Sequence, residues 1–237
     1  MISKFKEIIR AVRGMLLYGN KVYCPLCDNT FRKFLRNNNR SNSRCPKCGS
    51  LERHRLFWLV FEKDLKHRIK VISGDKLVHV APERCLEKKF RKLYDYLSID
   101  LYSQNVMKRM DVTALDLNDE SVDVFVCNHV LEHVQDDKKA IAEIFRVLKT
   151  NGWASLQVPI KGEATLEDPT IVSEADRLKY YGQEDHVRQF GMDVIERFKD
   201  AGFSVGVYTP DQFEKTVISK IDPEGVENEI IICEKLM

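Results

Sequence analysis

Four cysteines in two matched pairs are the residues of this 237-residue chain with the clearest metal-binding chemistry. Cys24-Pro-Leu-Cys27 and Cys45-Pro-Lys-Cys48 are separated by 17 residues, which is within the spacing of four-cysteine zinc ribbons. Each pair forms a tight knuckle that presents two thiolates to one ion. Because four thiolates leave no coordination position for water, we expect a structural zinc ion bound by all four cysteines.

A second group of polar side chains follows the apolar run Val122–Cys127. The group consists of Asn128, His129, Glu132 and His133. An imidazole has a suitable pKa for proton transfer, so His133 is a candidate general base. A structural hydrogen-bonding role for His133 stays open as the alternative.

The segments around this polar turn predict a strand, a helix and a second strand in sequence. The first strand is Val122–Cys127, the helix runs from about Asp137 to Lys149 with a stop at Gly152, and the second strand ends at Pro159. This order is a parallel crossover unit, and ligands of such sheets bind beyond the carboxyl ends of the strands. The polar turn is therefore expected at a binding site.

The same segment resembles the class I S-adenosylmethionine-dependent methyltransferases, especially their type 11 group. The resemblance rests on D-V-F-V-C-N-H-V-L-E-H-V at 123–134, the following D-D-x-x-A helix, R-V-L-K and N-G. It implies an α/β fold: a Rossmann-like seven-stranded methyltransferase sheet with helices on both faces, after a small N-terminal zinc ribbon. We expect the last strands, Val205–Tyr208 and Glu229–Cys233, to supply an antiparallel edge.

The resemblance also implies a site for S-adenosylmethionine. Asp100 ends the predicted strand Tyr96–Asp100, where a carboxylate can accept from the ribose hydroxyls, as in dinucleotide folds. The family's glycine-rich first loop is replaced by Ala81-Pro82-Glu83, in which Glu83 can accept from the cofactor's ammonium group. The other residues implied to line the cofactor are Asp111 and the Val112 amide at the adenine, and Asn128 and His129.

The missing glycines leave a second hypothesis open, a non-catalytic binding protein on a degenerate methyltransferase fold. However, the two C-P-x-C pairs and S-L-E-R-H-R ahead of the domain resemble a bacterial group of zinc-ribbon methyltransferases that also has an A-P-E turn. We therefore expect an active enzyme. Cys85, Cys127 and Cys233 are expected to be small packed residues rather than nucleophiles.

A dense polar cluster lies in the segment of about 161–190, which we interpret as a substrate lid over the active site. Asp185 and His186 are candidate catalytic residues that can act as an oriented base. Arg188 can bind an anionic group of the substrate in a bidentate contact, and Glu167 and Asp168 are further substrate candidates. The alternative is that the cluster only fixes the lid by internal ion pairs.

Charge and periodicity predict several modules. Residues 1–70 carry a net charge of +12 and the remainder −10. We expect an amphipathic helix in 1–20, the zinc ribbon in 21–50, a connecting helix in 51–70, which Ser50 can cap, and the methyltransferase domain in 71–237. The apolar positions of the first helix are Ile2, Phe5, Ile9, Val12 and Leu16.

The acceptor of the methyl group is not specified by these motifs. The polar lid slightly favours a small molecule or a glycan. RNA is the alternative, because basic residues and two phenylalanines interleave around the ribbon; they are Arg32, Lys33, Arg36, Arg40, Arg44, Lys47, Arg53, Arg55, Phe31 and Phe34.

The expected location is the cytoplasm. Seven cysteines, four of them in C-x-x-C pairs, are typical of a reducing compartment with bound metal. No run reaches the roughly 20 apolar residues that span a bilayer. The first helix can contact a membrane surface, although docking on the protein is the favoured interpretation.

Overall fold

The chain divides into two compact units in a computed structural model that describes residues 2–66, 74–225 and 229–236. Unit 1 comprises Met1–Val71, Glu83–Lys89 and Tyr208–Ile230, and unit 2 comprises Ile72–Pro82, Phe90–Val207 and Ile231–Met237. The end of the predicted connecting helix at 67–70 and its boundary with the next domain lie outside the described residues. The predicted domain boundaries stay a prediction.

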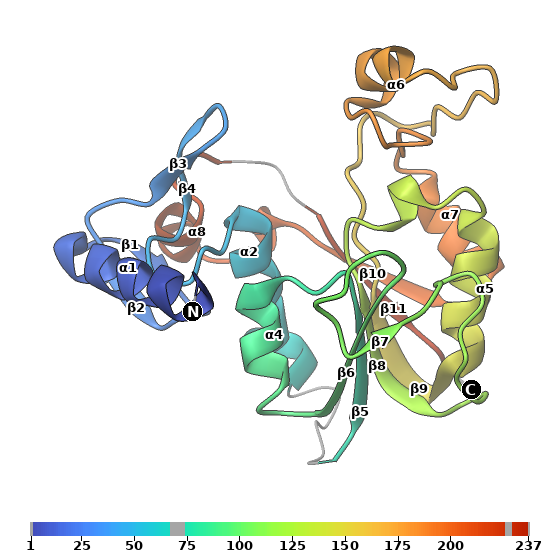
Figure 1. Cartoon of the computed structure of the whole chain (residues 1–237), viewed down its shortest axis with the longest axis horizontal. Helices are drawn as coiled ribbons and strands as arrows, with labels where there is room; N and C mark the ends of the chain where they lie inside the picture. The colour runs from blue at the N-terminus through green and yellow to red at the C-terminus, as the bar shows by residue number, and fades with distance from the viewer. Residues whose placement is uncertain (1, 67–73, 226–228, 237) are drawn as a thin grey trace. The chain divides into compact units, whose positions relative to one another are not determined.

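Unit 1 contains two small antiparallel hairpins and several short helices (Figure 1). The hairpins are formed by β1 with β2 and by β3 with β4. The elements are α1 Ile2–Leu16, β1 Tyr18–Cys24, β2 Asn29–Phe31, β3 Leu35–Asn37, β4 Arg40–Arg44, α2 Glu52–Val60, the π-helix η1 Phe61–Leu65, α4 Arg84–Phe90, η3 Pro210–Gln212 and α8 Lys215–Ile221.

Arg55 of α2 connects three parts of unit 1. Its guanidinium lies 3.9 Å from the centroid of the Phe34 ring and donates to the carbonyl oxygens of Ser43 (2.8 Å), Ser50 (2.9 Å) and Ile221. The side chain is completely buried. Arg55 therefore fixes α2 to the ribbon and to α8, and it does not contribute to a basic surface.

The described part of α1 leaves apolar side chains exposed, among them Ile9, Val12 and Leu16. The helix contacts the ribbon through Arg13, whose guanidinium donates to the Pro46 carbonyl oxygen at 3.2 Å. The side chains of Ile2 and Phe5 lie outside the described set. The buried Gly14 lies against Lys47, where an added Cβ would be 3.3 Å from the lysine Cβ. Among the described side chains, docking on the protein is thus observed at Arg13 and Gly14, while Ile9, Val12 and Leu16 stay exposed.

Unit 2 is built on a seven-stranded mixed sheet with the order β10-β11-β9-β8-β5-β6-β7. Neighbouring strands from β9 to β7 run parallel, and β11 pairs antiparallel with β9. The predicted α/β class is confirmed, and β11 is antiparallel to β9 as predicted, while the direction of the edge strand β10 stays a prediction. The strands are β5 Lys76–Val80, β6 Asp95–Asp100, β7 Lys108–Arg109, β8 Val122–Cys127, β9 Leu148–Ser155, β10 Ser204–Tyr208 and β11 Ile230–Glu234.

Most residues of the central strands β5 and β8 are buried, as is typical of a parallel sheet with both faces covered. Phe125 of β8 shares one buried cluster with Ile141 and Ile144 of α5 (Asp137–Val147) and with Phe198 of α7 (Val194–Asp200). In Figure 1, α5 and α7 lie on the same side of this sheet. The core thus fixes the turn between β8 and α5, which contains the predicted polar residues.

The predicted helix stop at Gly152 is wrong. Helix α5 ends at Val147 and β9 starts at once at Leu148, so Gly152 lies inside the strand. The register of β9 on β8 shifts between Leu148 and Trp153, where Asn151 has a φ of 65°. A Cβ atom on Gly152 would lie 2.9 Å from the Asp123 and Lys149 carbonyl oxygens, so close backbone packing explains this glycine.

The predicted lid contains a helix, α6 (Glu174–Tyr181). Ser173 caps its amino terminus by accepting from the Asp176 amide, and Gly182 ends it with a φ of 88°. The ends of the lid segment are joined by bridges between Ile160 and Phe190 and between Leu166 and Gln189.

No helix within the described ranges is long and apolar enough to cross a membrane.

Candidate functional site

The carboxyl ends of β5, β6 and β8 meet at one edge of the sheet because these strands are parallel neighbours. Ala81 follows β5, Asp100 ends β6 and Asn128 follows β8. The register pairs Val80 with both Ile99 and Cys127. The structure thus brings these three predicted cofactor positions to neighbouring strand ends, where ligands of parallel sheets bind.

Ala81 adopts a backbone conformation that favours glycine. Its φ is 44°, and its amide donates to the Ile99 carbonyl oxygen at 2.9 Å. The residue is exposed, and Pro82 follows it. The backbone therefore makes a left-handed turn at this position although the chain has no glycine there.

Replacing Ala81 by glycine should raise the free energy of unfolding by about 1 kcal/mol, because glycine adopts a positive φ without a Cβ clash. Urea unfolding measures the change. Ala154→Gly is the control: Ala154 is buried inside β9 and is not among the positive-φ residues, so glycine there should be destabilising by about 1 kcal/mol or more. A loss of stability in Ala81→Gly would contradict the strained turn.

Asp100 holds the loop after β6 with one carboxylate oxygen. Its Oδ1 accepts from the amides of Tyr102 and Ser103, both at 2.7 Å. Among the described contacts no donor lies on Oδ2, and the side chain is partly exposed. One carboxylate oxygen thus remains for a ligand while the other fixes the loop.

Asp111 caps its own turn. Its Oδ1 accepts from the Thr113 amide at 2.8 Å and from the Thr113 hydroxyl at 2.9 Å. The neighbouring Val112 side chain is buried in the core cluster of unit 2. Both predicted adenine contacts stay predictions.

The turn after β8 is tied to the end of β9. Asn128 is buried, and its Oδ1 accepts from the Ser155 hydroxyl at 2.7 Å. The Ser155 hydroxyl oxygen in turn accepts from the side-chain Nε2 of Gln157 at 3.0 Å. His129 has a φ of 54°, and its amide donates to the Gln157 carbonyl oxygen at 2.7 Å. These bonds orient the backbone that presents His129 and the residues after it.

The three predicted catalytic residues lie together. His133 Nδ1 is 3.2 Å from Asp185 Oδ2, and the rings of His133 and His186 meet edge to face with centroids 4.7 Å apart. Sequence reasoning missed the role of Glu132, which is buried beside them with Oε1 3.6 Å from His129 Nδ1. Its position three residues after His129 is the sequence signal that could have indicated it.

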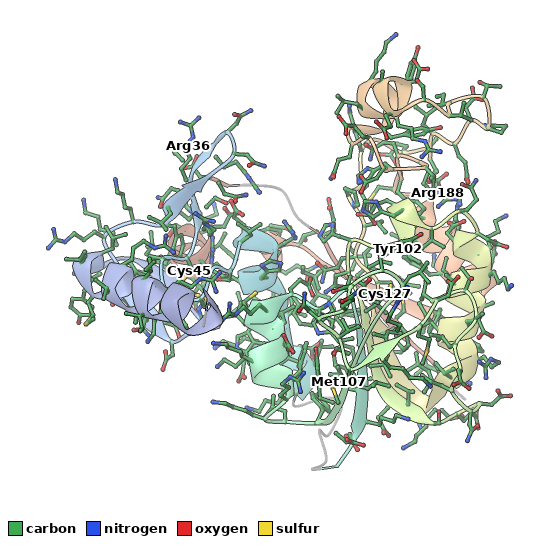
Figure 2. The ribbon with its side chains drawn as sticks, in the orientation of Figure 1. Arg36, Cys45, Tyr102, Met107, Cys127 and Arg188 are labelled. Atoms are coloured by element: carbon green, nitrogen blue, oxygen red, sulfur yellow. The ribbon has the colours of Figure 1, made fainter. Side chains whose placement is uncertain are left out.

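Arg188 is completely buried and binds the chain itself (Figure 2). Its guanidinium donates to the backbone carbonyl oxygens of Leu131 (2.9 Å), Val134 and Gln135 (2.9 Å), and to Glu167 Oε1 at 2.7 Å. Arg188 is predicted to bind an anionic group of the substrate, and in the structure its guanidinium pairs instead with a carboxylate of the lid, Glu167. For Arg188 the geometry matches the alternative in which the cluster fixes the lid.

Glu167 completes this lid network. It lies 3.0 Å from Arg197, which also pairs with the buried Asp137 at 2.7 Å. Burial alone would raise the pKa of Glu167, but hydrogen bonds from Arg188 and Arg197 outweigh burial, so the pKa lies below its ordinary value.

The third substrate candidate, Asp168, is exposed and lies in a local turn. Its Oδ1 accepts from the amide and the hydroxyl of Thr170 at 2.8 and 2.7 Å, which lowers the pKa of the carboxyl. A cavity of about 280 Å³ opens beside Glu167 and Asp168. Its other lining residues are Gln135, Pro169, Ile171, Val172, Arg177 and Val187.

The four cysteines of unit 1 converge as predicted. Their Sγ atoms lie within 4.8 Å of one another, with Cys24 to Cys48 at 3.5 Å and Cys27 to Cys45 at 3.7 Å. Sulfur atoms around a tetrahedral zinc ion are separated by about 3.8 Å, given Zn–S bonds of about 2.3 Å. The donor set and its spacing therefore fit zinc. Figure 2 marks the position of Cys45.

Ser50 does not cap α2 as predicted. The N-cap is Leu51, and the buried Ser50 hydroxyl lies 3.2 Å from the Sγ atoms of both Cys24 and Cys48. The Leu51 amide donates instead to His54 Nδ1 at 3.0 Å. The Ser50 hydroxyl thus contacts the sulfur cluster, and the start of α2 is paired through His54 instead.

The basic surface of the ribbon is smaller than the sequence indicated. Phe31 and Phe34 are buried and provide no stacking surface, and Arg40 pairs with the buried Glu52 at 3.2 Å. Arg36 projects from the β3–β4 hairpin (Figure 2). The exposed basic residues of the predicted set are Arg32, Lys33, Arg36, Arg44 and Lys47.

Glu83 and Cys85 belong to unit 1. Glu83 Oε1 lies 3.8 Å from Nε2 of His54, and the predicted contact of Glu83 with the cofactor stays a prediction. Burial raises the pKa of the Cys85 thiol and, in unit 2, of the Cys233 thiol. Together with the complete burial of Cys127, this is typical of packed residues rather than nucleophiles.

Residues 71–156 match the family model of the methyltransferase domain, type 11. The match covers β5 to β9 and the segments between them. A search of the curated proteins found no match to this chain.

Solved structures with the same fold include methyltransferases and one other enzyme. Phosphoethanolamine N-methyltransferase 2 of Haemonchus contortus, in complex with S-adenosyl-L-methionine, is 15% identical with a TM-score of 0.52, over 76% of this chain and 53% of that one. A SAM-dependent methyltransferase from Archaeoglobus fulgidus is 11% identical with a TM-score of 0.50, over 76% and 99%. The [4+2]-cyclase SpnF is 14% identical with a TM-score of 0.54, over 86% and 87%.

These likenesses establish the fold of the S-adenosylmethionine-dependent methyltransferases. They do not identify a reaction, because the cyclase has the same fold.

Proposed function

We propose that this protein is an S-adenosylmethionine-dependent methyltransferase whose cofactor binds at the carboxyl ends of β5, β6 and β8. The observation that carries the proposal is Asp100, whose Oδ1 holds the following loop while no described donor occupies Oδ2. The family match over residues 71–156 supports the same assignment. The left-handed turn at Ala81 supports it as well, since it lets backbone approach a ligand without a glycine.

In this proposal Asp100 binds the ribose hydroxyls, and Asp111 and the Val112 amide bind the adenine. Asn128 and His129 line the cofactor beside the transferred methyl. Because the sulfonium is already an activated leaving group, positioning of the acceptor and exclusion of water contribute more than proton transfer.

Replacing Asp100 by alanine should weaken binding of S-adenosylhomocysteine by about 100-fold, since each hydrogen bond to a charged group contributes about 1.5–3 kcal/mol. Asp100→Asn should be milder, because its Oδ1 still accepts from Tyr102 and Ser103. Calorimetry with the purified full chain measures both.

Asp95→Ala is the matched control for this experiment. Asp95 lies at the opposite end of β6 and is exposed, so its loss should leave affinity unchanged. If the wild-type protein binds neither S-adenosylmethionine nor S-adenosylhomocysteine, the proposed function is wrong. If Asp100→Ala binds as tightly as wild type, Asp100 is not the ribose acceptor.

The four-cysteine cluster is proposed to hold a structural zinc ion. The Sγ separations of 3.5 and 3.7 Å and the Ser50 hydroxyl beside two of the sulfurs support this role. A zinc ion there would supply the cross-link that the two small hairpins of unit 1 need, because isolated two-stranded hairpins are only marginally stable.

The proposed acceptor is a small molecule or a glycan. The lid supports this choice, since it is polar and is fixed by the Arg188 network to the turn that carries His133. The cavity of about 280 Å³ beside Glu167 and Asp168 suits a compact ligand.

A further inference from the structure

Three metal-ligating side chains of unit 2 converge away from the four cysteines. Glu132 and His133 lie on a 3-10 helix, Leu131–His133, directly after β8, and His186 comes from the lid segment after α6. One ligand atom from each of the three lies within 4.8 Å of the other two. The lid thus completes a cluster of two imidazoles and one carboxylate.

Two atoms of the cluster are buried without a described partner. Glu132 is 2% exposed and His186 is 3% exposed. Among the residues that the structure describes, neither Glu132 Oε2 nor His186 Nε2 has a hydrogen-bond partner. Leaving a buried polar atom unpaired costs about 1–3 kcal/mol, so two such atoms in one cluster indicate a ligand that pairs with both.

The opposite ring nitrogen of each histidine is already engaged. His186 Nδ1 lies 3.1 Å from the Tyr181 carbonyl oxygen, and His133 Nδ1 lies 3.3 Å from the Asp185 carbonyl oxygen. Because a carbonyl oxygen only accepts, Nδ1 carries the proton, and Nε2 of the neutral ring presents a lone pair. Histidines that bind metal ions show this arrangement.

The carboxylate and the first histidine are also held by neighbours. Glu132 Oε1 lies 3.6 Å from His129 Nδ1, which orients the carboxylate, and Oε2 is the oxygen without a described partner. Asp185 Oδ2, 3.2 Å from His133 Nδ1, supports the imidazole as a carboxylate does in many metal sites.

We propose that Glu132, His133 and His186 bind a divalent transition-metal ion such as Zn²⁺ or Fe²⁺. Two histidines and one carboxylate are the ligand set of open zinc sites and of non-haem iron sites. Binding requires the ligand atoms to approach to about 3–4 Å of one another. The His133 side chain is 33% exposed and has room for this movement.

Three protein ligands leave coordination positions open, unlike the closed four-cysteine cluster. If the proposed function holds, an oxygen donor of the methyl acceptor would occupy one of them, because the cluster lies directly after β8. The metal site itself does not depend on that function, and its test measures metal binding alone.

Titration of the metal-free full chain with Co²⁺ separates the two clusters, since only a thiolate site gives intense sulfur-to-cobalt charge-transfer bands. We expect wild type to bind about two ions per chain, one with and one without these bands. Glu132→Gln and His133→Ala should each bind about one ion and keep the thiolate bands. His133→Ala guards against misfolding because its side chain is partly exposed.

Glu184→Gln is the matched control, since Glu184 is an exposed carboxylate of the same lid loop. Glu184→Gln should bind about two ions. Cys45→Ser should still bind the ion at Glu132, His133 and His186, which gives no thiolate bands. A wild-type protein that binds only through its thiolates overturns the proposal, as does full retention of the second ion in both cluster variants. Normal cobalt binding in a protein that does not bind S-adenosylmethionine would uphold the metal site and reject only the methyltransferase function.

Discussion

If the four-cysteine cluster holds zinc as proposed, replacing Cys45 by serine is expected to release the ion and to unfold the segment around it. Binding of structural zinc contributes about 10–16 kcal/mol to the folding of small zinc domains, which is more than the total stability of most domains. Cys45 is completely buried, and its carbonyl oxygen also accepts from the Gly49 amide at 3.0 Å. The substitution therefore removes a sulfur ligand and leaves only this backbone bond to hold the knuckle.

The two tryptophans of the chain allow each unit to be monitored separately. Trp58 is buried on α2 of unit 1, and Trp153 is buried on β9 of unit 2. The Arg55 side chain, on the same helix as Trp58, binds the ribbon carbonyls of Ser43 and Ser50. In a Trp153→Phe background, Cys45→Ser or a strong chelator should therefore shift the emission of Trp58 to longer wavelength.

In a Trp58→Phe background the emission of Trp153 should change much less, because its strand belongs to the other unit. Cys85→Ala is the control for loss of a thiol, since Cys85 is a buried cysteine of unit 1 outside the cluster. It should keep its zinc, as measured by elemental analysis. Retention of zinc and of Trp58 emission in Cys45→Ser would contradict the structural role.

The sheet could be predicted from the sequence because its signals are local. Val122–Cys127 is a continuous apolar run, and the structure has a strand with the same bounds. The helix that follows begins at the predicted Asp137, which lies directly after its N-cap, Asp136. The helix ends at Val147, close to the predicted end at about Lys149, but Gly152 is not its stop, because backbone packing inside β9 explains this glycine.

The lid contacts could not be predicted because they join residues far apart in sequence. Arg188 resembled a substrate ligand, since an arginine in a polar loop gives no indication of the carbonyl oxygens it will meet at Leu131 and Gln135. Likewise, Glu132 could not be predicted as a possible metal ligand, because it is the lid that brings His186 beside it. The sequence indicates a basic surface that includes Phe34, whereas the Phe34 ring is buried against the Arg55 guanidinium.

Replacing Arg188 by methionine should lower the free energy of unfolding of unit 2 by about 3–5 kcal/mol, the cost of removing one partner from a buried ion pair. Arg188 is completely buried, and its loss leaves the carbonyl oxygens of Leu131 and Gln135 without this donor. It also weakens the pairing of the buried Asp137, which lies 3.6 Å from the Arg188 guanidinium. Denaturant unfolding followed by Trp153 emission measures the loss.

Arg197→Met is the matched control, because Arg197 pairs with the same two carboxylates, Asp137 and Glu167, but is 19% exposed and donates to no carbonyl of the turn. Its loss should cost less than that of Arg188. Arg188→Lys should recover little, since an ammonium cannot reproduce the planar fork that reaches several acceptors at once. The backbone amides of Val187 and Gln189 donate to the carbonyl oxygens of Glu132 and Leu166, respectively. Hydrogen exchange at these two amides should accelerate in both Arg188 variants. If Arg188→Met and Arg197→Met have equal and small effects, the lid is held mainly by its other contacts, and Arg188 is free to have the substrate role that its sequence position first indicated.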